Sequence, residues 1–159
     1  MSAWLRGALT GRAKSPAIKG RWRSRRNDGL ALEGVRILVV EDYVDFRESL
    51  VQSLELDGAH VLTAGGGNSG FAMHLREGSD VILSDLCMAG GTGYDLIRLV
   101  RQLGAEEGGL VRAIAMSSAG DADAAIATGF HAFLAKPFAY LDLVDAIARL
   151  VRPSETQIH

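Results

Sequence analysis

Five short runs of apolar residues recur from residue 35 onward, and their spacing is the strongest constraint on the fold of this chain. They cover residues 35–40, 60–63, 81–84, 111–116 and 130–135. Each run is too short for an ordinary helix, and two are almost continuously apolar, which is typical of parallel strands buried on both faces. The runs therefore predict five buried strands.

The segments between these runs have helical spacing. Phe46, Leu50 and Leu54 recur every four residues, and a shorter helix is expected around residues 71–76. Two further apolar stripes consist of Leu96, Val100 and Leu103, and of Leu141, Val144, Ile147 and Val151. Strands that alternate with helices predict an α/β class fold, a doubly wound five-stranded parallel sheet with helices on both faces.

The charge is divided unequally along the chain. Residues 1–33 carry eight basic and two acidic side chains, a net charge of +6, whereas the remainder carries nine basic and seventeen acidic ones, a net charge of −8. The first segment also lacks apolar periodicity and is rich in Gly, Ser and Arg. We therefore predict a flexible, disordered basic N-terminal extension at 1–33, a folded domain at 34–152 and a short C-terminal tail at 153–159.

Three further expectations come from composition. Basic residues 1–26 suit a solvated tail, with contact to nucleic acid or anionic lipid, or organelle targeting, as alternatives. A lone cysteine, Cys87, excludes a disulfide framework and a multi-cysteine zinc site. No stretch approaches the ~18 consecutive apolar residues of a membrane span, so a cytoplasmic protein is expected.

Polar side chains stand directly after four of the predicted strands. Glu41 and Asp42 follow the first, Asp85 the third, Ser117 ends the fourth and Lys136 follows the fifth. Ligands of open parallel sheets bind at the carboxyl ends of the strands. Crowded carboxylates need a counter-charge, which Mg²⁺ and a lysine can supply. The chemistry that uses all of these groups together is phosphoryl transfer to a carboxylate.

With these residues in place, the chain resembles a known family, the receiver domain of two-component response regulators. The resemblance covers about residues 35–151 and is carried by the segments ILVVEDYVDFRESL, VILSDLCMAGGTGYDLI, AIAMSS and GFHAFLAKPF. It implies a flavodoxin-like sheet with strand order 2-1-3-4-5. It also implies a protein that is not an enzyme apart from catalysing its own phosphorylation and dephosphorylation.

The resemblance assigns roles to individual residues. Asp85 corresponds to the phosphoacceptor, and the Mg²⁺ ligands correspond to Asp42, Asp85, the backbone carbonyl of Cys87 and, through water, Glu41. Ser117 and Lys136 correspond to the residues that bind the phosphoryl group, and Phe133 to the aromatic switch residue. A cis peptide bond is expected at Lys136-Pro137.

The implied function is that of a single-domain response regulator or phosphorelay intermediate. A histidine kinase or histidine phosphotransfer protein would donate the phosphoryl group, and the downstream protein partner is unknown. No DNA-binding domain is expected after Arg152, so the output would be protein contact.

Two departures from the family pattern lead to separate expectations. Ala89 stands where the family usually has proline, so the loop after Asp85 is expected to be looser. The interval between Ser117 and Gly129 is short, so the helix between them is expected to lose most of a turn.

Three alternatives to phosphoryl acceptance remain at this stage. One is a pseudo-receiver, an interaction module that is never phosphorylated. A second is dinucleotide binding, because residues 65–70 match G-x-G-x-x-G after a predicted strand. A third is a haloacid-dehalogenase-like phosphatase, which would need an aspartate where Cys87 stands.

Overall fold

The computed structural model describes residues 30–119 and 122–152. The strands are β1 (Arg36–Val40), β2 (His60–Ala64), β3 (Val81–Asp85), β4 (Arg112–Ser117) and β5 (Ala132–Ala135). The helices are α2 (Val44–Leu56), α3 (Gly67–Glu77), α4 (Gly93–Arg101), α5 (Ala122–Thr128) and α6 (Tyr140–Val151), with a short 3-10 helix, η2, at Ala105–Glu107. Each strand begins and ends within two residues of its predicted run.

The five strands form one parallel sheet in the order β2-β1-β3-β4-β5. This confirms the predicted α/β fold and its flavodoxin-like strand order. The chain moves outward from β1 to β2 and then crosses back to β3, so the order reverses beside β1. The carboxyl ends of β1 and β3 therefore border the switch point at which ligands of this sheet type bind.

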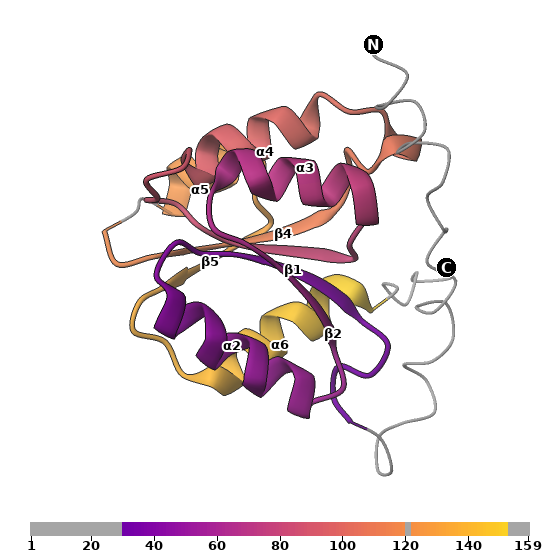
Figure 1. Cartoon of the computed structure of the whole chain (residues 1–159), viewed down its shortest axis with the longest axis vertical. Coiled ribbons are helices and arrows are strands. Elements are labelled where there is room, and N and C mark those ends of the chain that lie inside the picture. The colour runs from indigo at the N-terminus through magenta and orange to yellow at the C-terminus, as the bar shows by residue number, and fades with distance from the viewer. Residues whose placement is uncertain (1–29, 120–121, 153–159) are drawn as a thin grey trace, which may run out of the picture.

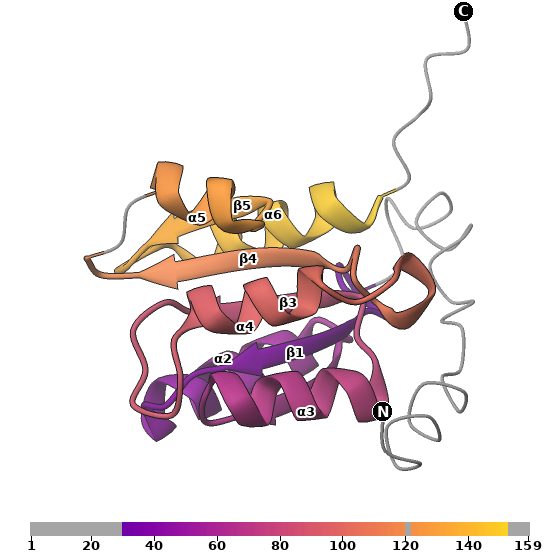
Figure 2. The same cartoon turned by 90° about the horizontal axis from the view of Figure 1, so that it is seen from above.

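Helices cover both faces of the sheet (Figure 1). α2 and α6 lie against one face, and α3, α4 and α5 lie against the other, as the view from above also shows (Figure 2). The central strand β3 is buried at all five of its residues. Such burial on both faces explains why the first three residues of this strand, at 81–83, are all apolar.

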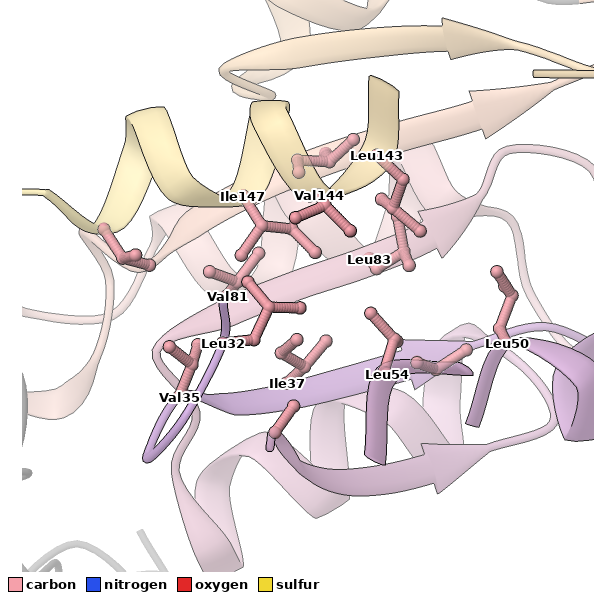
Figure 3. Close-up of a cluster of buried hydrophobic side chains, with 14 of the residues drawn as sticks. Leu32, Val35, Ile37, Leu50, Leu54, Val81, Leu83, Leu143, Val144 and Ile147 are labelled. Carbon is pink, nitrogen blue, oxygen red and sulfur yellow. The ribbon is translucent and has the colours of Figure 1, made fainter. Parts of the chain in front are cut away.

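The core between the sheet and the α2–α6 layer is built from aliphatic side chains (Figure 3). Ile37 and Val81 of neighbouring strands meet Leu54 of α2 and Ile147 of α6 there, and Leu32 joins them although it precedes β1. Leu32 is fully buried, and its amide donates to the Asp57 carbonyl at 2.8 Å. Burying such a side chain stabilises a fold by about 1.5–3 kcal/mol.

The packed region therefore begins before the predicted boundary at residue 34, because residues 30–33 are described and Leu32 lies in the core. The rest of the predicted extension, residues 1–29, and the predicted tail, residues 153–159, lie outside the described residues. The expected disorder of the extension and its contacts with nucleic acid or lipid fall on that part of the chain.

Two residues of the predicted apolar stripes do not lie on the buried faces of the helices. Leu141 is 72% exposed, because α6 turns a face through Leu143, Ile147 and Val151 toward the sheet instead. Leu103 lies beyond the end of α4 and is only half-buried. The buried face of α4 consists of Leu96, Ile97 and Val100.

Helix lengths follow the spacing of the sequence. α5 has seven residues, in agreement with the short interval between Ser117 and Gly129. α2, with 13 residues, is the longest helix in the described ranges, and no helix there is long and apolar enough to cross a membrane.

Candidate functional site

The polar residues at the strand ends meet at one edge of the sheet. Glu41 directly follows β1, Asp85 is the last residue of β3, Ser117 ends β4 and Lys136 directly follows β5. The backbone ladder continues past the strands, because the Glu41 amide donates to the Ala64 carbonyl at 3.0 Å and the Lys136 amide to the Ser117 carbonyl at 2.9 Å. Neighbouring strands thus fix these residues side by side.

Lys136 forms the centre of this cluster. Its Nζ atom lies 2.9 Å from Asp85 Oδ2 and 3.2 Å from Glu41 Oε2. Only 2% of the Glu41 side chain and 11% of the Asp85 side chain are exposed, against 20% for Lys136. Two carboxylates are therefore withdrawn from water together with the ammonium group that neutralises part of their charge.

This burial changes the protonation of the cluster. Burial, the hydrogen bond with Asp85 and the charge of Asp85 raise the pKa of Glu41 from 4.5 to about 7, although Lys136 opposes them. For Lys136, burial alone would lower the pKa, but the bonds and charges of Asp85 and Glu41 outweigh it and raise the pKa. Without another cation, Lys136 is charged at neutral pH and Glu41 retains a proton in a large fraction of molecules.

The loop after β3 is bonded to the carboxylates. The Cys87 amide donates to Asp85 Oδ1 at 3.0 Å, and the Ala89 amide donates to Asp42 Oδ2 at 3.2 Å. A Cβ atom on Gly93 would overlap the Asp85 carbonyl oxygen, so glycine allows the close approach of α4 to the end of β3. The loop therefore orients Asp85 through Oδ1, and Lys136 orients it through Oδ2.

A second contact holds the same loop, and we call it the glycine clasp (Gly66, Gly67, Gly90 and Gly91). The Gly67 amide donates to the Gly91 carbonyl at 3.0 Å, and the Asn68 amide to the Gly90 carbonyl at 3.3 Å. A Cβ atom on Gly66 would come within 2.6 Å of the Gly90 oxygen. Bare backbone on both sides is what permits this approach.

The glycine clasp bears on two sequence predictions. The loop after Asp85, which lacks a proline at Ala89, is bonded to α3 on one side and to Asp42 on the other, and whether it is looser than in the family stays a prediction. In a dinucleotide site, the amides at the start of α3 would face a pyrophosphate. Here the Gly67 and Asn68 amides donate to loop carbonyls instead, which argues against that use of the motif.

The side chains of the two predicted switch residues have other partners than the charged groups. Ser117 is buried, and its Oγ atom accepts a hydrogen bond from the Ala119 amide at 3.2 Å. Phe133 is half-buried on β5 and packs against the core on the α3–α5 side of the sheet, next to Ala115 of β4 in register. The bond between Lys136 and Pro137 is cis, as predicted.

Two residues at the site were not predicted from the sequence. The Arg47 guanidinium donates to the Glu41 carbonyl at 2.8 Å, and Lys136 Nζ lies 4.5 Å from the centroid of the Phe46 ring. The sequence indicates Phe46 only as a member of an apolar helical stripe. Both residues lie in the first turns of α2, immediately after the acidic pair, which is the one signal in the sequence that could have indicated them.

The carboxylates form a possible cation site. One oxygen each from Glu41, Asp42 and Asp85 lies within 4.8 Å of the others. Carboxylate oxygens are hard ligands that suit Mg²⁺, and the exposed position of Asp42 leaves room for the water ligands that this ion keeps. The residues present therefore fit the predicted cation in both type and proximity.

The sequence matches a known family over most of its described length. The profile described as "Response regulator receiver domain" matches residues 37–148. A 14.6 kDa protein from the sodA1 3′ region of Leptolyngbya boryana is 35% identical over 114 residues, which is 70% of this chain and 86% of that protein. The response regulator MprA of Mycobacterium leprae is 33% identical over 118 residues.

That match covers 74% of this chain but 51% of MprA, and a match to the probable transcriptional regulatory protein TcrX of Mycobacterium tuberculosis covers 53% of TcrX. The chain therefore spans about half the length of these relatives.

Solved structures share the fold. A response regulator receiver domain protein of Clostridium thermocellum is similar with a TM-score of 0.67 and 27% identity, over 74% of this chain and 94% of that one. The chemotaxis response regulator CheY4 of Vibrio cholerae, at 24% identity, is similar with a TM-score of 0.66, over 73% of this chain and 98% of that one.

Proposed function

Because the chain belongs to the response regulator receiver domain family, we propose that Asp85 accepts a phosphoryl group in a Mg²⁺-dependent reaction. The donor is the phosphohistidine of a histidine kinase or of a histidine phosphotransfer protein. The observation that carries the proposal is the Lys136 ammonium, 2.9 Å from Asp85 Oδ2 and 3.2 Å from Glu41 Oε2. It places a cation against the carboxylate at which negative charge would accumulate.

The chain then acts as a cytoplasmic single-domain response regulator or phosphorelay intermediate, with a receiver domain at 34–152. Its catalysis is limited to its own phosphorylation and dephosphorylation, and its output is contact with another protein.

The metal site in this proposal uses the acidic cluster. Asp42 and Asp85 are direct ligands, the Cys87 carbonyl is a third, and Glu41 acts through water. When bound, Mg²⁺ supplies positive charge to the oxygens of the transferred phosphoryl group. The support for this assignment is that the three carboxylates offer oxygens within 4.8 Å of one another.

The proposed reaction is a direct displacement at phosphorus. An Asp85 carboxylate oxygen forms a bond to phosphorus while the bond from phosphorus to the imidazole nitrogen of the donor breaks. The electron pair of that bond stays on the nitrogen. Lys136, which is charged because its pKa is raised, exchanges its bond to Asp85 for one to a phosphoryl oxygen. The Cys87 amide holds Asp85 Oδ1 and so limits the rotation of the carboxylate.

The proposed output begins at Ser117. Its hydroxyl exchanges the Ala119 amide for a phosphoryl oxygen, and the space that it vacates lets Phe133 turn inward. The surface formed by α5, β5 and α6 then changes shape and binds a downstream protein. Hydrolysis of the aspartyl phosphate reverses the change.

Phosphorylation with a small donor tests the proposal. The protein is incubated with Mg²⁺ and acetyl phosphate, and its intact mass is measured. We expect the mass increment of one phosphoryl group in the wild type and in Asp95→Asn, a control that alters an exposed carboxylate of α4. We expect no increment in Asp85→Asn.

An increment that persists in Asp85→Asn would overturn the acceptor. A wild-type protein that takes no label from acetyl phosphate or from a histidine kinase would favour the pseudo-receiver instead.

A further inference from the structure

The ammonium group of Lys136 has a third neighbour besides the two carboxylates, the aromatic ring of Phe46. Lys136 Nζ lies 4.5 Å from the centroid of that ring. A cation within about 6 Å of an aromatic centroid is attracted by the negative face of the ring, and the attraction grows when water is excluded. The Lys136 side chain is 20% exposed, so the contact is made largely out of water.

The ring is held in place from two sides. Phe46 lies in the first turn of α2 and packs against the α2–α6 core. Phe138, two residues after Lys136, meets it with ring centroids 6.2 Å apart and planes at 69°. This edge contact is a favoured aromatic geometry. The segment that carries Lys136 therefore also supports the ring over which its ammonium lies.

The three contacts of Lys136 differ in what happens to them during the proposed reaction. Asp85 would become bonded to phosphorus, and Glu41 would help to hold Mg²⁺ when the ion is bound, so both carboxylates would exchange partners. The Phe46 ring has no other ligand to bind and stays in place throughout.

We propose that Phe46 is a positioning residue for phosphoryl transfer, whose ring keeps the Lys136 ammonium at the reacting oxygens while its carboxylate partners change. The inference rests on the proposed function, since the step that it assists is the phosphorylation of Asp85. It also separates Phe46 from a residue that only fills space, because an aliphatic side chain of similar size would pack at this position without attracting the ammonium.

Three variants test the inference. Phe46→Leu keeps an apolar side chain and removes the ring, Phe46→Tyr keeps the ring, and Phe138→Leu removes the neighbouring ring as a matched control. For each protein, the rate constant of labelling by acetyl phosphate is measured at saturating Mg²⁺. Proton NMR records the shift of the Lys136 Hε atoms, which lie upfield when an ammonium stem sits over a ring. Thermal melting reports whether each variant is folded.

We expect Phe46→Leu to react about fivefold more slowly than the wild type and to lose the upfield shift of Lys136. Phe46→Tyr should restore both, and Phe138→Leu should keep most of the shift.

An unshifted Lys136 in the wild type would overturn the inference, and this observation needs no variant at all. The inference would also fail if Phe46→Leu labelled at the wild-type rate, or if Phe46→Tyr were as slow as Phe46→Leu. A wild-type protein that takes no label would instead overturn the proposed function, and the positioning role with it. A persisting Lys136 shift would then identify the failure as one of the reaction and not of the contact.

Discussion

Two partly buried cations stand at opposite ends of the sheet, and their partners differ in kind. Lys136, at the carboxyl ends of the strands, binds the carboxylates of Asp85 and Glu41. Arg101, at the end of α4, donates to backbone carbonyls in the segments that precede β4 and β5. These are Gly129 O at 3.0 and 2.7 Å, Gly109 O at 2.8 Å and Val111 O at 2.7 Å.

The difference separates a structural cation from a functional one. Carbonyl groups do not titrate or accept phosphoryl groups, and the one ionisable partner of Arg101 in the described part of the chain is the His131 ring, whose Nδ1 lies 3.4 Å from the guanidinium. Arg101 therefore has no carboxylate partner there and holds two connecting segments together. The partners of Lys136 can change state, as the rise in the pKa of Glu41 to about 7 indicates. Around Arg101, burial and the charges of Arg101 and Arg112 lower the pKa of His131, which disfavours a further positive charge there. A buried cation bonded to carboxylates is thus the better indicator of a reactive site.

Replacing Arg101 should affect stability and leave the chemistry intact. Arg101→Met leaves three carbonyls without their charged donor, so we expect the free energy of unfolding to fall by about 3 kcal/mol. Urea unfolding measures this change. Arg98→Met, on the exposed side of α4 in an ion pair with Asp95, should change stability by less than about 0.5 kcal/mol. If folded Arg101→Met were labelled more slowly than the wild type, Arg101 would not be a purely structural cation.

Replacing Lys136 should slow phosphorylation strongly and lower stability less. Lys136→Met removes the charge that would stabilise the phosphoryl oxygens, so we expect labelling by acetyl phosphate to slow by about a hundredfold. Stability should fall less than in Arg101→Met, because Glu41 can take up a proton and relieve the repulsion from Asp85. Labelling at the wild-type rate would show that Lys136 is a structural cation like Arg101.

The raised pKa of Glu41 predicts a pH dependence opposite in sign to that of the Arg101 end, where the lowered pKa of His131 makes stability rise with pH. In metal-free buffer, folded Glu41 holds its proton up to about pH 7, whereas unfolded Glu41 loses it near its ordinary value of 4.5. Between these values the folded state binds more protons, so its stability falls as the pH rises. We expect Glu41 to contribute a loss of about 2 kcal/mol across this range, measured by urea unfolding in the presence of a chelator as the difference between the wild type and Glu41→Gln.

Glu41→Gln is the control for that measurement. It has no proton to release, so its stability should fall less over the same pH range. An equal fall in both proteins would assign the effect to other groups.

The glycine clasp predicts the smallest change. In Gly66→Ala the new methyl group meets the Gly90 oxygen at 2.6 Å, so the loop after Asp85 must shift, at a cost of about 1.5 kcal/mol. Gly65→Ala is a matched control, because its methyl group would meet only the end of the Arg47 side chain, at 3.4 Å. Thermal unfolding of both variants measures the difference. Equal stabilities would mean that the loop yields without cost.

The sequence predicted those parts of the site that depend on strand order. Apolar runs located the strands, and Asp85 and Lys136 could be assigned to one edge because parallel strands end together. The contact of Lys136 with Phe46 could not be predicted in this way, because it depends on how α2 and the segment after β5 pack in three dimensions.

The misassignment of Leu141 has a similar cause. Leu141 fits the spacing of an apolar stripe, but the rotation of α6 is decided by which of several apolar positions packs best, and Leu143 is buried instead. The bonds of the loop after Asp85 could not be predicted either, because the glycine clasp joins segments more than 20 positions apart. Long-range backbone contacts of this kind leave no periodic signal.

Locating the phosphoryl group within the chain tests the central claim most directly. Borohydride reduces an aspartyl phosphate to homoserine, so peptide mass spectrometry after treatment with acetyl phosphate and Mg²⁺ identifies the residue that was modified. We predict homoserine at position 85, dependent on Mg²⁺ and strongly reduced in Lys136→Met. Homoserine at position 42 or 45, or an unmodified Asp85 in a protein that carries label, would contradict the assignment of Asp85 as the phosphoacceptor.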